Sequence, residues 1–355
     1  MTDLRDKPKD LRDEDAFDAA ALNAWLKSEV DGLGGEPEVK QFSGGASNLT
    51  YLLRYPDREL IMRRPPAGQK AKSAHDMGRE YRVQKHLAPA FPYVPKMLAH
   101  CLDETVIGSE FYVMEKLDGI ILRKNLPRGM DLAPTEARSL CESMVDRLVD
   151  LHQVDPKAVD LASLGRGTGY VQRQVEGWSK RFRAAKTWNV PGYENVMSWL
   201  AERQPADSGA CLIHNDYRFD NLVLAADDPQ RIIGVLDWEM ATIGDPLMDL
   251  GGALAYWTEA NDDRFLQSLR RQPTHVPGMF TRQEVVEYYL DKQGLTNVDW
   301  AFYEVFGMFR VAVILQQIYY RYHHKQTTNP AFKNWWIASN YLYWRCRSAI
   351  KKARD

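Results

Sequence analysis

The hydrophobic pattern in the first third of the chain changes several times between helical and strand-like spacing. Apolar residues recur at helical intervals over 15–30, and the glycine-rich stretch DGLGGEP ends this predicted helix. Residues 73–88 have a second helical pattern, which ends at Pro89. Short apolar runs bounded by turn residues predict strands at 38–42, 49–55, 59–64, 96–101 and 110–117. The first third therefore predicts a sheet accompanied by few helices.

Beyond Gly119 the hydrophobic spacing is mostly helical. Two short apolar runs, CLI and LVL, predict strands on either side of the polar octet HNDYRFDN (214–221), and the run RIIGVLDWEMA predicts a strand that ends at Asp237. Helices are predicted at about 134–152, 170–186, 193–203, 246–259, 281–294, 300–323 and 330–351. A sheet-rich part followed by a helical part is typical of an α+β fold.

The same pattern predicts how the chain divides. We expect a disordered, charged arm over 1–14, a small N-terminal lobe over 15–117 and a larger, mostly helical C-terminal lobe over 118–355. The small lobe would contain an antiparallel sheet and a helix. A length of 355 residues is ample for two such lobes.

Composition narrows the classes of function. The formal net charge of -2 gives no reason to expect a nucleic acid or a membrane as partner. The charged N-terminal run does not have the pattern of a signal peptide, and no apolar run is expected to span a bilayer. The four scattered cysteines have neither metal-site spacing nor a disulfide framework, so we predict four buried thiols and a cytoplasmic location.

The polar octet contains the pattern of a phosphoryl-transfer loop. His214, Asp216 and Asn221 match H-x-D-x-x-x-x-N, the catalytic loop of the protein-kinase fold. Phosphoryl transfer needs one carboxylate that receives the proton of the attacking hydroxyl, and oxygen ligands that hold a divalent ion. Asp237 ends the apolar strand after the octet, where the kinase fold has the aspartate that binds Mg²⁺ between the phosphates.

With the tail LDWE followed by GDPLMDLG, these motifs resemble the kinase-like phosphotransferases over about residues 35–325, specifically the aminoglycoside/choline phosphotransferase (APH) superfamily. The run RRPP (63–66) is similar to the phosphotransferase-like domains joined to acyl-CoA dehydrogenases. The resemblance implies a two-lobed protein-kinase-like fold whose small N-terminal lobe binds the nucleotide, and a kinase that uses ATP and Mg²⁺ on the hydroxyl of a small-molecule acceptor. It also makes an acyl-CoA dehydrogenase a candidate partner.

The resemblance also implies roles for individual residues. Asp216 would receive the acceptor's proton, Arg218 would place a cation over the transferring phosphate, and Asn221 and Asp237 would hold the metal. The residues expected to bind the nucleotide are Ser43, Gly44, Gly45, Ser47 and Asn48 in the phosphate-covering loop, Arg63 where kinases have lysine, Glu80 as its ion-pair partner, and the backbone of Glu115 and Leu117 at the adenine edge. The loop lacks the full G-x-G-x-x-G pattern.

Other polar residues near these motifs have structural interpretations. We expect His214 to brace the catalytic loop, Asp249 to hold the loop backbone, and Asp245 to favour a helix N-terminus. Arg218 could instead form a surface salt bridge. Glu239 stays open between supporting the metal ligands and being a plain polar neighbour.

The acceptor is not fixed by the sequence. Arg173, Lys180, Arg181 and Arg183 lie on one predicted helix, where a solvated face is the common explanation. They also fit an anionic acceptor, such as a hydroxyacyl-CoA. Two alternatives remain, which are a non-catalytic nucleotide-binding module that partners an acyl-CoA dehydrogenase, and an aminoglycoside or choline-type kinase.

Overall fold

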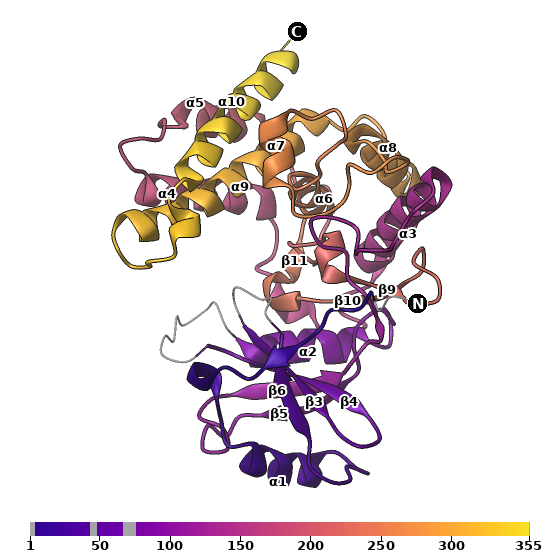
Figure 1. The fold of residues 1–355 in the computed structure, drawn as a ribbon. Coiled ribbons are helices and arrows are strands. Elements are labelled where there is room, and N and C mark those ends of the chain that lie inside the picture. Colours follow the sequence, from indigo (N-terminus) through magenta and orange to yellow (C-terminus); the bar gives the residue numbers. More distant parts are fainter. Residues whose placement is uncertain (1–3, 43–47, 67–75, 355) are drawn as a thin grey trace. The chain divides into compact units, whose positions relative to one another are not determined.

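The computed structural model describes residues 4–42, 48–66 and 76–354, and they form two compact units (Figure 1). The first unit comprises residues 1–144, 157–161 and 219–241, and the second comprises 145–156, 162–218 and 242–355. Sheet and helices combine in an α+β fold, as predicted. The boundary predicted after residue 117 does not coincide with this division, because residues 219–241 return to the first unit and pair with its strands.

A six-stranded antiparallel sheet forms the centre of the first unit in the described part of the chain. The strands predicted at 38–42, 49–55, 59–64, 96–101 and 110–117 are confirmed to within two residues at each end. In spatial order the sheet consists of β1 (Lys9–Asp10), β2 (Glu38–Gln41), β3 (Leu49–Arg54), β4 (Glu59–Arg64), β6 (Phe111–Glu115) and β5 (Met97–Cys101).

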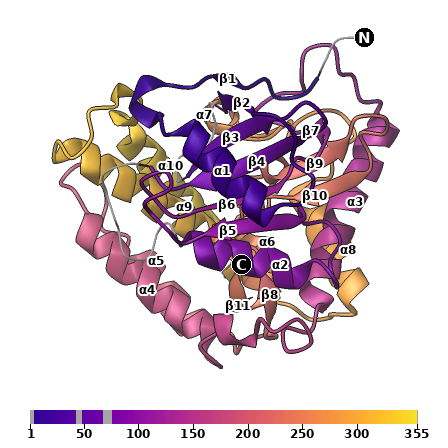
Figure 2. The same ribbon diagram turned by 90° about the horizontal axis from the view of Figure 1, so that it is seen from below.

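Each face of this sheet is covered by one helix, α1 (Ala19–Glu29) on one side and α2 (Met77–Leu87) on the other (Figures 1 and 2). Alternation along the strands produces the two faces, since successive side chains of a strand point to opposite sides. The α1 face buries, among others, Leu22, Leu26, Tyr51, Leu53, Leu60, Met62, Phe111 and Val113. The α2 face buries Leu52, Ile61, Met77, Tyr112 and Met114.

A second, three-stranded sheet completes the first unit, with the order β10 (Ile232–Val235), β9 (Leu222–Ala225) and β7 (Gly119–Ile120). Gly119 allows β7 to approach β9 closely, because a Cβ at this position would lie 2.3 Å from the backbone oxygen of Leu224. The segment that follows β6 is thus held against the hairpin β9–β10.

The second unit is mostly helical. Its helix α9 (Trp300–His323) packs against α4 (Tyr170–Ala185), α6 (Pro246–Leu254) and α10 (Trp335–Lys352). The other helices are α5 (Glu194–Arg203), α7 (Arg264–Leu269) and α8 (Arg282–Gln293), and α3 (Pro134–Gln153) crosses from the first unit into the second. All predicted helices are present, but α6 ends at Leu254, α10 begins at Trp335 and α7 was not predicted.

The two strands that bracket the polar octet belong to different sheets. β8 (Cys211–Ile213) pairs with β11 (Thr242–Gly244) in the second unit, whereas β9 pairs with β10 and β7 in the first. The chain passes from the second unit to the first between Arg218 and Phe219, inside the octet. The four cysteines are buried thiols, as predicted.

Two expectations from the sequence are corrected by the structure. Residues 1–14 were predicted to be disordered, but the described residues 4–14 include β1, which pairs with β2, and Arg5, which bonds to Asp118. No apolar run was expected to approach the length needed to span a bilayer, but α9 is long and apolar enough by length and composition, with a mean hydropathy of 1.3. Burial inside the protein covers 67% of that apolar window, as the packing of α9 among other helices explains.

Candidate nucleotide site and catalytic loop

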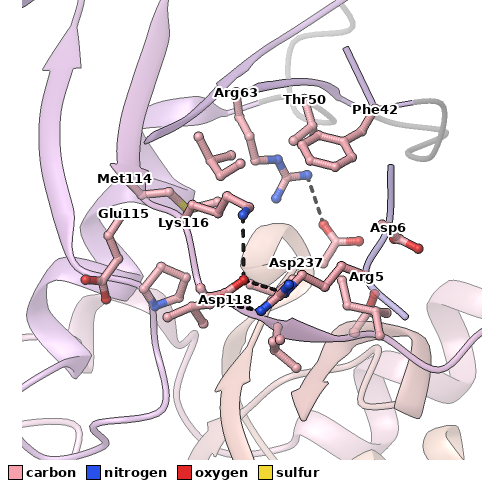
Figure 3. A pocket seen from close by; sticks show the side chains of 18 of the residues that line it. Arg5, Asp6, Phe42, Thr50, Arg63, Met114, Glu115, Lys116, Asp118 and Asp237 are labelled. Atoms are coloured by element: carbon pink, nitrogen blue, oxygen red, sulfur yellow. Dashed lines mark hydrogen bonds and ion pairs between the residues drawn. The ribbon is translucent and has the colours of Figure 1, made fainter. Parts of the chain in front are cut away.

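A cavity of about 530 Å³ lies within the first unit (Figure 3). Its apolar lining includes Ile61, Met114, Leu117 and Val223. Arg63, Asn221 and Asp237, which the sequence predicts to act on the phosphates and the metal, also line it, and so does Glu115. The structure therefore brings five predicted site residues from four separate segments of the chain to one cavity.

Arg63 reaches the cavity because of its register in β4. It lies two residues after Ile61 and so shares the α2 face, whereas Arg64 points to the α1 face and bonds to the hydroxyl of Tyr51. Arg63 forms an ion pair with Glu80 of α2, as predicted, and its Nη2 lies 3.2 Å from Oδ1 of Asp237 (Figure 3).

The charge of Arg63 is secured by its surroundings. Burial acts to lower the pKa of Arg63, but the carboxylate of Glu80, with smaller contributions from Tyr112 and Asp237, holds that pKa well above its usual value. Glu80 itself is fully buried and does not line the cavity, so it pairs with Arg63 without bordering the cavity. A fixed positive charge therefore borders the cavity.

Asn221 and Asp237 are held side by side by the hairpin β9–β10. Leu222 pairs with Val235, and beyond this pair the backbone N–H of Leu236 donates to the backbone oxygen of Asn221 at 2.8 Å. Asp237 follows with a left-handed backbone, φ 69°. Non-glycine residues adopt this conformation at an energetic cost, and such residues cluster at functional sites.

The predicted adenine edge lies where β6 ends. The backbone N–H of Glu115 donates to the backbone oxygen of Lys96 at 2.9 Å, and both Glu115 and Leu117 line the cavity. Gly234 makes room for Leu117, because a Cβ at residue 234 would lie 2.1 Å from its Cδ1. The position of Leu117 thus depends on a glycine in β10.

The phosphate-covering loop is only partly described. Ser43, Gly44, Gly45 and Ser47 lie outside the described residues. Asn48 was predicted to donate to phosphate, but it is buried, does not line the cavity, and donates from Nδ2 to Glu239 at 3.2 Å. This bond gives Glu239 a partner from the sheet and decides for neither of its two predicted roles.

Asp216 and Arg218 belong to the second unit. Nη1 of Arg218 lies 2.9 Å from Oδ1 of Asp216, and its guanidinium lies 4.6 Å above the ring of Tyr256. Only 12% of the Arg218 side chain is exposed, so the pair with Asp216 is not a surface salt bridge. Burial raises the pKa of Tyr256, Asp216 raises it further, and Arg218, Arg310 and Arg271 act to lower it.

Asp249 and His214 hold the loop as predicted. The carboxylate of Asp249 accepts from the backbone N–H groups of His214 and Asn215 at 2.8 and 2.7 Å, and also bonds to His152. Nδ1 of His214 accepts from the backbone N–H of Asp216 at 3.2 Å. Burial acts to raise the pKa of Asp249, but His152 and the other partners bring it below its usual value. The loop before Asp216 is therefore anchored by a buried carboxylate.

Comparison with known proteins identifies the family. Residues 38–285 match the phosphotransferase enzyme family (APH). The chain belongs to this family. It is 37% identical to mouse acyl-CoA dehydrogenase family member 10 over 304 residues, which cover 85% of this chain and 28% of that protein. The chain thus spans less than a third of the length of this relative.

Solved structures agree with this assignment. A Ralstonia eutropha protein provisionally named an aminoglycoside phosphotransferase is 31% identical, with a TM-score of 0.80 over 95% of this chain and 99% of that chain. A complex of a thermostable mutant of aminoglycoside phosphotransferase APH(4)-Ia with AMP-PNP and hygromycin B is 14% identical, with a TM-score of 0.56 over 94% and 98% of the two chains. The second likeness supports the fold alone, and the predicted kinase-like fold is confirmed.

The structure adds residues to the candidate sites that the sequence did not indicate. Arg5, Lys7 and Lys116 line the cavity. In the second unit, Nη2 of Arg310 donates to the backbone oxygen of Asn215 at 2.6 Å, next to Asp216. Lys116 directly follows Glu115 and could have been noticed there, whereas Arg310 lies in an apolar helix pattern that gives no such signal.

Proposed function

We propose that this protein is an ATP- and Mg²⁺-dependent phosphotransferase that moves the γ-phosphate to a hydroxyl of a small molecule. The observation that carries the proposal is the single cavity lined by Arg63, Asn221, Asp237 and the end of β6. These residues supply a phosphate cation, two oxygen ligands and a purine edge, the parts that phosphoryl transfer requires. Family membership and the AMP-PNP named in the APH(4)-Ia complex support ATP as the donor.

The nucleotide would lie with its purine between Ile61, Met114, Leu117 and Val223, an apolar slot of the kind that planar ligands favour. The carbonyl of Glu115 and the backbone of Leu117 would meet the polar edge of the base. Arg63 would then face the phosphates. A guanidinium stays charged and can make two parallel bonds to a phosphate, so arginine can serve where kinases have lysine.

The donor set fits Mg²⁺. The described residues contain no group of three or more His, Cys, Asp or Glu side chains suited to a metal. Mg²⁺ is usually bound through one or two protein oxygens together with substrate phosphates, and Asn221 with Asp237 matches that pattern. When bound, the ion would neutralise charge on the phosphates.

Asp216 would hold the acceptor hydroxyl and receive its proton. It lies five residues before Asn221 in the chain, with its backbone fixed by His214. Arg218 would pass from Asp216 to the transferring phosphate and stabilise charge that develops there. Positioning supplies most of the catalysis in this chemistry, so Asp216 does not need a raised pKa.

The acceptor that fits best is anionic, such as a hydroxyacyl-CoA. On α4, Arg173 is occupied by the backbone oxygens of Gly167 and Thr168, and Arg183 by Glu194, so the basic helix offers mainly Lys180 and Arg181. More cations lie beside the catalytic loop. Arg218, Arg310 and Arg271 act to lower the pKa of Tyr256, whereas Asp216 raises it. The relative named as an acyl-CoA dehydrogenase family member points to the same chemical class.

The test is acceptor-dependent release of ADP. The purified protein is incubated with ATP, Mg²⁺ and a pooled metabolite extract, in parallel with Asp216→Asn and the control Asp227→Asn, an exposed aspartate in the β9–β10 turn. We expect Asp216→Asn to lose about 100-fold or more in rate, as for loss of a general base, and the control to keep the wild-type rate. Stabilisation by nucleotide without ADP from any acceptor would instead support the non-catalytic module.

A further inference from the structure

Residues 5–7 form part of the cavity wall in the first unit. Arg5, Asp6 and Lys7 all line the cavity, although they lie more than 30 residues before any other residue that does so. The segment is held at its far end by β1, where Lys9 and Asp10 pair with β2. Residues 5–7 therefore continue from the edge strand β1 and line the proposed nucleotide cavity.

Two ion pairs hold this wall at the cavity. Nε and Nη2 of Arg5 lie 2.7 and 2.8 Å from the carboxylate of Asp118 (Figure 3). Oδ2 of Asp6 accepts from Nη2 of Arg123 at 2.5 Å, and Nη1 of Arg123 donates to the backbone oxygen of Asp220. Asp118, the partner of Arg5, directly follows Leu117 at the predicted adenine edge. Asp220, which accepts from Arg123, directly precedes Asn221.

Lys7 differs from the other described cations that line the cavity in its pairing. Arg5 and Arg123 are paired as above, Arg63 with Glu80 and Asp237, and Lys116 with Glu59. Lys7 lines the cavity, and within the described residues the structure shows no ion pair for it. A nucleoside triphosphate is strongly anionic, and Lys7 can contribute to its binding as a flexible point charge.

We propose that residues 5–7 are a component of the nucleotide site. Arg5 is a positioning residue that keeps the wall closed through Asp118, on the nucleoside side of the cavity, and Lys7 contacts the nucleotide. This inference rests on the proposed nucleotide site and adds a segment that the kinase-like motifs do not include.

The test measures nucleotide binding by isothermal titration calorimetry, with ATP and Mg²⁺ and no acceptor. Exposed ion pairs are individually weak, so we expect Arg5→Ala to raise the Kd about threefold to fivefold. Deletion of residues 2–8 removes both ion pairs and Lys7, and is expected to raise the Kd about tenfold or more. Lys7→Ala should weaken binding on its own.

Arg54→Ala is the matched control. Its side chain is 46% exposed against 43% for Arg5, it also pairs with carboxylates in the same unit, and it does not line the cavity. We expect this variant to bind as the wild type does. Arg5→Asp with Asp118→Arg reverses the pair, and the double variant should recover affinity that each single change loses, which a general loss of structure would not produce.

The outcomes separate this inference from the proposed function. If the wild type binds no nucleotide, the proposed function fails. If the wild type binds but Arg5→Ala and the deletion bind equally well or more tightly, residues 5–7 are no part of the site and the inference fails. Unchanged affinity in Lys7→Ala would remove Lys7 from the proposal.

Discussion

Arg63 has two tasks that can be separated by substitution. It neutralises Glu80, which is fully buried, and it presents a cation to the cavity. Arg63→Ala leaves the carboxylate of Glu80 buried without its partner, so we expect a loss of about 3–5 kcal/mol in the free energy of unfolding. Arg63→Lys keeps the charge and should lose less. Urea denaturation measures both, and the double variant Arg63→Ala, Glu80→Gln should be more stable than Arg63→Ala alone.

Arg64 provides the control for this prediction. It is buried like Arg63 but points to the opposite face of the sheet, where it bonds to Tyr51 and to the backbone oxygen of Asp15. Arg64→Lys should lower stability and leave the Kd for nucleotide unchanged, whereas Arg63→Lys should weaken nucleotide binding. Equal effects of the two variants on affinity would contradict the assignment of Arg63 to the phosphates.

At the residue scale, short-range patterns predict more than long-range contacts do. The period-two alternation of β4 places Arg63 and Arg64 on opposite faces, and the Arg63–Glu80 pair was expected. The bond from Asn48 to Glu239 was not predicted, because the two residues lie 191 positions apart. The bond from Arg5 to Asp118 spans 113 residues and depends on the path of a segment whose charged sequence suggested disorder. Spacing along the chain contains no information about such contacts.

Among the helices, α4 depends on an aspartate from another part of the chain. The carboxylate of Asp207 accepts from the backbone N–H groups of Gly169, Tyr170 and Val171 at 2.6, 3.0 and 2.9 Å. The first N–H groups of a helix have no partner within it, so this carboxylate acts as an N-terminal cap. We expect Asp207→Asn to lower the free energy of unfolding at pH 7 by about 1–2 kcal/mol.

The effect of Asp207 should depend on pH in a defined direction. Burial acts to raise the pKa of Asp207, but the three N–H donors bring it below its usual value. A carboxyl whose pKa is lower in the folded state contributes stability above its unfolded pKa of about 3.9, and this stability disappears as the pH falls through the folded value. The stability gap between wild type and Asp207→Asn should therefore close in acid. A gap that stays constant from pH 7 to pH 2 would contradict a charged cap.

The hydrophobic pattern predicts which helices and strands form more readily than it predicts which strands pair with one another. The apolar pattern is sufficient for α3, α9 and the strands β3 to β6 of the first sheet, because each of them contributes buried apolar side chains to a core. The strands β8 and β9 were also predicted, but not that they pair in different sheets, since three-residue apolar runs do not determine their neighbours. β1 was missed because its two residues, Lys9 and Asp10, are exposed and polar.

The proposed binding of nucleotide and the proposed activation of the acceptor involve residues of different units. All described residues that line the proposed nucleotide cavity belong to the first unit, whereas Asp216 and the arginines near Tyr256 belong to the second. Substitutions in the second unit should therefore change acceptor use without changing nucleotide affinity. The net charge of -2 for the entire chain does not reveal this local concentration of cations, so it was not predictable from composition.

Arg271 allows the proposed acceptor class to be tested. It is exposed and outside the nucleotide cavity, and its charge acts on Tyr256, as does that of Asp216. Rates are compared for a hydroxyacyl-CoA, the corresponding free hydroxy acid, choline and hygromycin B. We expect the CoA ester to be preferred, and Arg271→Ala to lower its kcat/KM about tenfold, the loss of one charge-assisted contact, while the KM for ATP stays constant. Arg264→Ala, an exposed arginine of α7, should have no effect. An anionic acceptor would be excluded if choline or hygromycin B had a higher kcat/KM than the CoA ester and Arg271→Ala accelerated that turnover. Removal of a cation favours a cationic substrate, because it removes electrostatic repulsion.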